Sequence, residues 1–214
     1  MRYKNLIFDL GGVIIDIKRE AAVGALEKIG VVEADRLLGE YEQKGLFLML
    51  EEGRLSDSEM YDSLLALANP GTTCTDIKTA FEDFLVGVPV ERLQRVEQLR
   101  EAGYKTYVLS NTNPIFYNDW IAKAFRQDGK SINDYFDGIV VSFQELMCKP
   151  TPGIFANLLS RYRLDPEATL FLDDSETNCA AAQTLGIHTV CIRPEGEHSF
   201  HSVTSSLLKE AKGN

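Results

Sequence analysis

This sequence has little positive charge for its length. Its 214 residues include 22 Lys and Arg but 32 Asp and Glu, which gives a formal net charge of −10. Sequence-independent binding to nucleic acid needs a basic surface that neutralises phosphates, so we expect no nucleic-acid partner. A pocket can still be locally positive on an acidic protein, and the composition therefore leaves room for a small phosphorylated ligand.

Cysteines and long apolar runs are also few. The four cysteines contain no CxxC pair, which argues against a zinc site. A chain of this size does not depend on disulfide bonds, so we expect reduced thiols and a cytoplasmic protein. The first apolar run, residues 6–8, is too short for a signal peptide, and no later run reaches the length of a bilayer span, so we expect no membrane partner. No phosphate-binding G-x-x-x-x-G-K-S/T loop or dinucleotide-binding G-x-G-x-x-G loop is present.

What the sequence does contain is an alternation of apolar strands and amphipathic helices. Helical patterns separate the later strands, and the strands are predicted at residues 6–8, 107–110, 138–142, 170–172 and 188–192. This alternation predicts an α/β fold, a Rossmann-like parallel sheet with helices on both faces. Residues 17–86 instead have an almost entirely helical pattern. We therefore predict an all-helical cap of residues 17–86, inserted in a core of residues 1–16 and 87–214.

Polar side chains follow the apolar residues at three of the predicted strand ends. Asp9 follows the first strand, Ser110 and Asn111 follow the second, and Asp173 and Asp174 follow a later one. Parallel sheets bind ligands at the carboxyl ends of their strands, so we expect these side chains to meet. Taken singly, each has a structural explanation as a turn residue or a helix cap. Their joint occurrence favours a functional site.

The residue types in this group indicate a particular chemistry. Three carboxylates at one sheet edge repel one another unless a cation or a proton offsets their charge. Oxygen ligands without nearby His or Cys favour Mg²⁺ over zinc, and Mg²⁺ commonly bridges to a substrate phosphate. Lys149 and Ser110 are candidates to bind phosphoryl oxygens, although Lys149 taken alone is more simply explained as a surface lysine. An aspartate beside Mg²⁺ can act as a covalent nucleophile.

Four stretches, in this order, resemble the motifs of the haloacid dehalogenase-like (HAD) hydrolases. They are FDLGGV at 8–13, VLSNT at 108–112, KPTPGIF at 149–155 and FLDDSETN at 171–178. The helical insertion between the first two is similar to that family's C1-type cap. The last three stretches are most similar to a bacterial branch that includes alpha-D-glucose-1-phosphate phosphatase. The resemblance implies a magnesium-dependent phosphatase that acts on a small phosphorylated metabolite through an aspartyl-phosphate.

The resemblance also implies a role for each matching residue in the phosphoryl-binding part of the site. Asp9 would be the nucleophile and a metal ligand. Ser110, Asn111 and Lys149 would bind the transferred phosphoryl group, with Lys149 also paired to Asp9.

For the metal, the resemblance implies that Asp174 is a direct ligand and that Asp173 lies beside it. Gly11 would contribute its backbone carbonyl. Asn178 occupies a position where many relatives carry an acidic residue that contacts the metal's ligands rather than the metal itself.

Gly11 is a departure from the pattern of most phosphatases of this family. They carry a second aspartate at this position, which protonates the leaving group and then activates water, and glycine cannot transfer a proton. A leaving group that is a better acid, such as an anomeric hydroxyl, suffers less from the loss, which favours a sugar phosphate as substrate. Asp16 is one substitute acid to consider, with an ordinary turn role as the alternative.

Two other functions fit parts of this pattern. 2-Haloacid dehalogenases also lack the second aspartate, but they use no metal, and the Asp173–Asp174 pair therefore speaks against them. A catalytically weak phosphoryl-binding protein would explain Gly11. Residues near 44–54 of the cap are candidates to face the site and set its specificity, and we expect a monomer or a weak dimer.

Overall fold

A five-stranded parallel sheet lies at the centre of the computed structural model, which describes residues 1–38, 45–126 and 129–213. The strand order is β5-β4-β1-β6-β7, which confirms the predicted α/β fold. The strands are β1 (Asn5–Phe8), β4 (Lys105–Ser110), β5 (Gly138–Val141), β6 (Thr169–Asp173) and β7 (His188–Cys191). All four residues of β1 are buried, because this strand is paired on both edges and covered on both faces.

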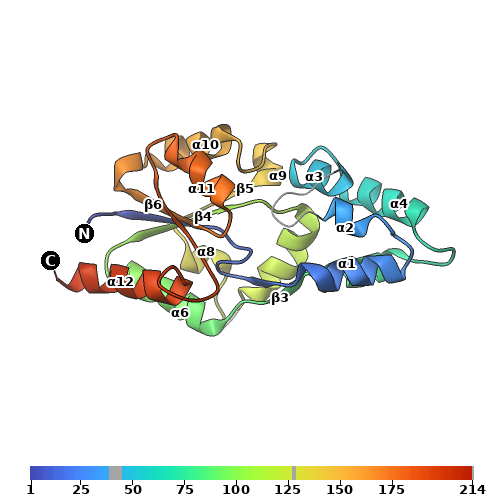
Figure 1. Ribbon diagram of the computed structural model, residues 1–214, viewed down its shortest axis with the longest axis horizontal. Coiled ribbons are helices and arrows are strands. Elements are labelled where there is room, and N and C mark those ends of the chain that lie inside the picture. The colour runs from blue at the N-terminus through green and yellow to red at the C-terminus, as the bar shows by residue number, and fades with distance from the viewer. Residues whose placement is uncertain (39–44, 127–128, 214) are drawn as a thin grey trace.

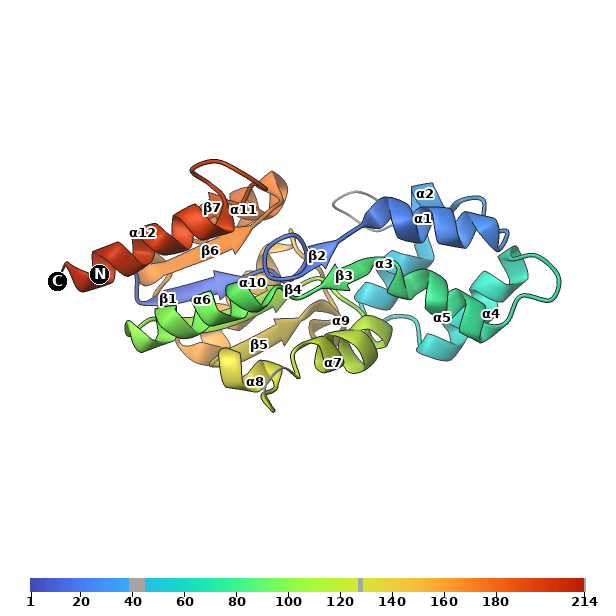
Figure 2. The same ribbon diagram turned by 90° about the horizontal axis from the view of Figure 1, so that it is seen from below.

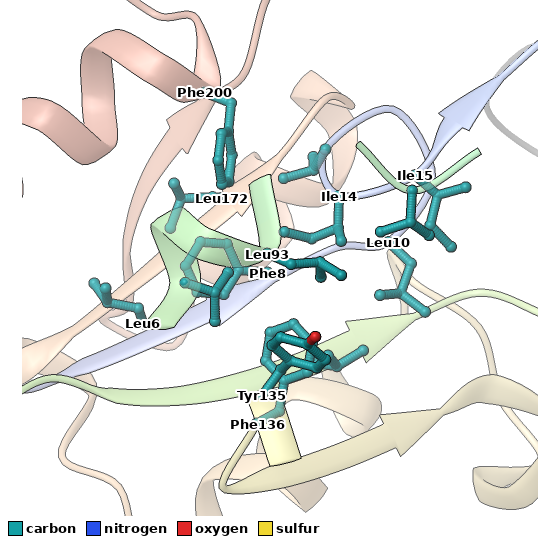
Figure 3. Packing of buried hydrophobic residues seen from close by; sticks show 14 of the residues in the cluster. Leu6, Phe8, Leu10, Ile14, Ile15, Leu93, Tyr135, Phe136, Leu172 and Phe200 are labelled. Atoms are coloured by element: carbon teal, nitrogen blue, oxygen red, sulfur yellow. The ribbon is translucent and has the colours of Figure 1, made fainter. Parts of the chain in front are cut away.

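Helices cover both faces of the sheet (Figure 1). Helices α6 (Val90–Glu101) and α12 (Phe200–Lys212) lie on one face, and α10 (Pro152–Tyr162) and α11 (Glu176–Gln183) lie on the other. Successive side chains of a strand point to opposite faces. Phe8 accordingly packs against Phe136 and Phe200, with ring centroids 6.2 Å apart in both pairs (Figure 3), whereas its neighbour Ile7 joins the cluster under α10. Full burial of such a side chain contributes roughly 1.5–3 kcal/mol.

Short helices complete the connections of the core. They are η1 (Phe116–Ile121), α7 (Ala122–Ala124), α8 (Ile132–Tyr135), α9 (Ser142–Glu145) and η2 (Pro166–Ala168). Within the described residues, no helix combines the length and the apolar character needed to cross a bilayer.

A separate group of helices lies beyond the carboxyl ends of the strands, toward which the strand arrows point (Figure 2). It comprises α1 (Arg19–Lys28), α2 (Ala34–Leu37), α3 (Gly45–Glu51), α4 (Asp57–Leu67) and α5 (Cys74–Glu82). These helices share a hydrophobic cluster of their own, which includes Leu26, Phe47, Met60 and Phe81. The Ser56–Glu59 capping box opens α4, with the Ser56 amide donating to the Glu59 carboxylate at 2.9 Å. We refer to α1–α5 as the cap.

Two short antiparallel strands join the cap to the core. They are β2 (Asp16–Ile17) and β3 (Leu85–Gly87). Residues 17 and 85–86, which the helical pattern had included, belong to these strands, and α1–α5 lie between them. Strands of two and three residues are too short to give the alternation of apolar and polar residues by which a strand is recognised. The boundaries of our division into a core (1–16, 87–214) and a cap (17–86) fall within this two-stranded ribbon, and the division stays a proposal.

Candidate active site

The topology of the sheet explains why distant carboxylates meet. β1 pairs with β4 on one side and with β6 on the other, so that Phe8 lies opposite both Val108 and Leu172. Asp9, directly after β1, is thereby placed between the ends of its two neighbours. One carboxylate oxygen from each of Asp9, Asp173 and Asp174 lies within 4.8 Å of the others. The structure thus brings together the acidic residues that the sequence predicted at separate strand ends.

Lys149 is the cation at the centre of this group. Its side chain is only 1% exposed, and its Nζ lies 2.9 Å from Asp9 Oδ1 and 2.6 Å from Asp173 Oδ2. Asn111 holds the lysine's backbone, since its side-chain amide donates to the Lys149 carbonyl at 2.9 Å and accepts from the Lys149 amide at 2.8 Å. Asn111 therefore positions Lys149, and a direct contact of Asn111 with phosphate stays a prediction.

The two neighbouring aspartates face different environments. Asp173 is fully buried, and its Oδ1 accepts hydrogen bonds from the Ser175 amide at 2.8 Å and from Asn178 Nδ2 at 3.0 Å. Asp174 instead lines a cavity. Gly12 makes room for it: a Cβ on Gly12, whose φ is +70°, would lie 2.2 Å from Asp174 Oδ2. Asn178 thus fixes Asp173, and only Asp174 of this pair is directed to the open space.

That cavity lies between the sheet edge and the cap. From the core it is lined by residues that include Asp9, Gly11, Ser110, Lys149 and Asp174. From the α3 helix of the cap it is lined by Phe47 and Glu51. Both lie within the range 44–54 in which we expected residues that face the site; Lys44 of that range lies outside the described residues.

A threonine for which the sequence predicted no role also lines this cavity. Thr112 is 3% exposed, and its Oγ1 is a buried oxygen without a hydrogen-bond partner among the described residues. Its place directly after Ser110-Asn111 was the one signal available in the sequence. A buried hydroxyl without a partner is available to form a hydrogen bond with a polar atom of a ligand.

Asp16, considered above as a substitute acid, forms an ion pair outside the cavity. Its Oδ1 lies 2.7 Å from Arg92 Nη2, and Asp16 is not among the residues that line the cavity. The ion pair gives it a structural role at the ribbon between core and cap.

The clustering of carboxylates has a clear electrostatic consequence. Burial raises the pKa of Asp9 to about 7, an effect that the charges of Asp173 and Asp174 reinforce and that Lys149 opposes. Burial and the charge of Asp173 also raise the pKa of Asp174. Burial disfavours the charged form of Lys149, but the charges of Asp173 and Asp9 outweigh it and hold the lysine's pKa above its usual value. The site therefore carries more negative charge than Lys149 neutralises, and its all-oxygen donor set fits Mg²⁺.

This electrostatic situation predicts how magnesium affects stability. Since the folded-state pKa of Asp9 lies above its ordinary value of 3.8, the unfolded chain ionises first as the pH rises, and the contribution of Asp9 to stability declines up to a pH of about 7. A bound cation competes with the proton. We expect Mg²⁺ to raise Tm more at about pH 8 than at about pH 5.5. At a hundredfold excess over its Kd, the bound ion adds about 2.7 kcal/mol to the free energy of unfolding.

Thermal melts with Mg²⁺ and with EDTA at both pH values test this expectation. Asp174→Ala is the matched variant, because it removes a cavity-lining carboxylate of the cluster, and it should lose most of the magnesium effect. An undiminished Tm increase in Asp174→Ala would place the cation elsewhere.

Comparison with known proteins adds independent information. A family model described as haloacid dehalogenase-like hydrolase matches residues 3–186. The D-ribitol-5-phosphate phosphatase of Bacteroides thetaiotaomicron is 39% identical over 205 residues, which cover 96% of this chain and 98% of that protein. A HAD family enzyme from the same organism, crystallised with magnesium and inorganic phosphate, superimposes with a TM-score of 0.83 at 35% identity, covering 91% of this chain and 96% of that chain. The L-2-haloacid dehalogenase of Xanthobacter autotrophicus shares the fold alone, with a TM-score of 0.61 at 20% identity over 97% of this chain and 83% of that chain.

Proposed function

This chain belongs to the haloacid dehalogenase-like hydrolase family, and we propose that it is a magnesium-dependent phosphatase of a small sugar or polyol phosphate. The observation that carries the proposal is the array of buried Lys149 and Asp173 with the partly exposed Asp9, which lies beside Asp174 in a cavity between core and cap. A fixed lysine and a surplus of carboxylate oxygens together suit a phosphoryl group and a divalent cation.

Asp9 is the proposed nucleophile. One of its carboxylate oxygens attacks phosphorus, the bond from phosphorus to the leaving oxygen breaks, and an aspartyl-phosphate forms. Water then attacks this phosphorus, which releases inorganic phosphate and regenerates the Asp9 carboxylate. The backbone holds the Asp9 carboxylate in place, since the Leu10 amide donates a hydrogen bond to Asp9 Oδ1 at 2.7 Å.

Lys149 and Ser110 are the proposed ligands of the phosphoryl oxygens. The Lys149 ammonium stays protonated and is held by Asp173 and Asp9, while the Asn111 side chain fixes the Lys149 backbone. Among the described residues, the Ser110 hydroxyl makes one long hydrogen bond of 3.3 Å, to the Asn111 carbonyl, which a phosphoryl oxygen can replace. Donors that are fixed before the reaction need no reorganisation as charge develops on the transferred group.

Magnesium would be held by Asp9, by Asp174 and by the Gly11 backbone carbonyl. When bound, it supplies positive charge to the phosphoryl oxygens and offsets the repulsion between them and Asp9. Asp173 uses both carboxylate oxygens on Lys149, Ser175 and Asn178, and we therefore assign it the task of positioning Lys149 rather than a direct place on the metal.

The proposed substrate class rests on the relatives and on the shape of the site. The Bacteroides relative is described as acting on ribitol 5-phosphate, in which the phosphate is carried by a primary alcohol. The cap over the cavity favours a small substrate that fits beneath it. Dehalogenase chemistry is not favoured, because the relation to dehalogenases is one of fold and the acidic cluster suits a metal-dependent reaction. A cytoplasmic location and a monomer or weak dimer stay predictions.

Phosphate release from a panel of phosphomonoesters tests the function. Ribitol 5-phosphate, glucose 1-phosphate and glucose 6-phosphate are each incubated with Mg²⁺ or with EDTA. We expect release that depends on magnesium, and the ratio between the substrates tests the leaving-group argument for an anomeric phosphate. Absence of release from all three, together with chloride release from 2-chloropropionate without metal, would contradict the proposal.

A further inference from the structure

Glu51 is a carboxyl group that the cap places over the reaction site. It is the last residue of α3, it is 9% exposed, and it lines the same cavity as Asp9, Ser110 and Lys149. Asp9 and Glu51 line the same cavity from the core and from the cap, and the charge of Asp9 adds to the effect of burial in raising the pKa of Glu51. Glu51 thus reaches the reacting centre from the side opposite the sheet.

The Glu51 carboxyl has no partner of its own. Among the described residues it makes no hydrogen bond and no ion pair, whereas the adjacent Glu52 accepts a hydrogen bond from Arg54 Nε at 2.7 Å. Buried acids are normally hydrogen-bonded or paired, so an unpartnered one at a cavity wall is available to a ligand.

The electrostatic surroundings favour the neutral, proton-bearing form of this acid. The pKa of Glu51 is raised to about 8, chiefly by burial and then by the charges of Asp9 and Glu52, against the opposing charge of Lys149. The Cys148 thiol also lies within electrostatic range and is held neutral by its own burial. Glu51 can therefore donate a proton near neutral pH.

The core offers no other group for this task among the residues that line the cavity. Gly11 has no side chain, Asp9 is the proposed nucleophile, Asp174 is a proposed metal ligand, and Lys149 is bound to two carboxylates. The backbone does not enforce glycine at position 11, since a Cβ there would meet only Ile17, at 3.7 Å. The missing acid is thus not replaced nearby in the core, and the cap supplies the remaining carboxyl.

We propose, on the basis of the phosphatase function above, that Glu51 is the catalytic acid and base of this enzyme, delivered by the cap in place of an acid at Gly11. As Asp9 attacks phosphorus, the leaving oxygen takes the electron pair of the broken P–O bond and the proton of Glu51, and it departs as a neutral alcohol. Water then enters the position the alcohol has left. The Glu51 carboxylate removes a proton from this water as it attacks phosphorus, the bond from phosphorus to Asp9 breaks, and Glu51 is protonated again.

The test compares two substrates whose leaving groups differ in their need for a proton. Ribitol 5-phosphate releases a poorly acidic primary alcohol, whereas 4-nitrophenyl phosphate releases a stable phenolate. In Glu51→Gln we expect kcat/KM for ribitol 5-phosphate to fall about 10²- to 10⁴-fold, and kcat/KM for 4-nitrophenyl phosphate to change by less than about tenfold. The glutamine keeps the size and polarity of the side chain but cannot donate the proton of a carboxylic acid.

A second measurement addresses the base role. Hydrolysis of the aspartyl-phosphate should become slow in Glu51→Gln, so that rapid mixing with 4-nitrophenyl phosphate gives a burst of one nitrophenolate per enzyme before slow turnover. Glu52→Gln is the matched control, since Glu52 is the neighbouring acid and is paired with Arg54, and it should behave like the wild type.

Each outcome decides one of the two proposals. Equal losses of kcat/KM for both substrates, or no loss for either, would overturn the role of Glu51 while the wild-type activity still supports a phosphatase. If the wild type hydrolyses neither substrate, the phosphatase function itself fails. Turnover of 4-nitrophenyl phosphate by Glu51→Gln also shows that the variant is folded.

Discussion

Asp9→Asn is expected to lower phosphate release by about 10⁴-fold or more while the fold stays intact. Asparagine has the shape of aspartate but lacks the anionic oxygen that attacks phosphorus. The fold should tolerate the change, because burial already disfavours the charge of Asp9 and raises its pKa to about 7. Lys149 keeps its second partner, Asp173, at 2.6 Å.

Three measurements on purified Asp9→Asn check this expectation. These are phosphate release, Tm in EDTA, and binding of inorganic phosphate, which should persist through Lys149 and Ser110. Asp16→Asn serves as the control, since Asp16 is paired with Arg92 and does not line the cavity, and its activity should stay within a few fold of the wild type. Substantial turnover by Asp9→Asn would show that the nucleophile is another group.

The positions of the core residues in this site were accessible from the sequence. The apolar runs before Asp9, Ser110 and Asp173 predicted strands, and parallel strands necessarily bring their carboxyl ends to one edge. The convergence of these side chains also depends on the strand order, which places β1 between β4 and β6 and which we did not predict. Hydrogen bonds were less accessible: the role of Asn111 depends on the backbone of Lys149, 38 residues further along the chain.

The cap was less predictable for a physical reason. Glu51, Glu52 and Arg54 are equally polar in the sequence, and only the packing of α3 and of the turn after it against the core decides which of them faces the cavity. The orientation of α3 is set by the packing of Phe47 and Leu50 into the cluster of the cap, which involves α1, α4 and α5. Tertiary contacts of this kind leave no local pattern in seven residues, and the identity of the cap acid therefore came only from the structure.

The second large effect is expected from Lys149→Met. Methionine has a similar length but no charge, so Asp9 and Asp173 would share a buried site without the cation between them. Removing one member of a buried ionic group costs about 3–5 kcal/mol, because the remaining charges stay desolvated. We expect a loss of this size in urea unfolding near neutral pH in EDTA. Lys105→Met is the control: Lys105 is 64% exposed and lies 3.2 Å from Asp137, and such surface pairs contribute about 0–1 kcal/mol.

Adding magnesium distinguishes the two roles that we assign to Lys149, which are to neutralise the buried carboxylates and to bind the phosphoryl group. A cation bound by Asp9 and Asp174 restores positive charge beside the orphaned carboxylates, so Mg²⁺ should recover part of the lost stability of Lys149→Met. It should not recover phosphate release, because no ammonium then contacts the phosphoryl oxygens and Asp173 has lost the group it positions. A variant that regains both stability and activity in magnesium would mean that Lys149 only neutralises charge. One that regains stability alone would mean that the fold is maintained by charge balance and that catalysis depends on where the positive charge stands.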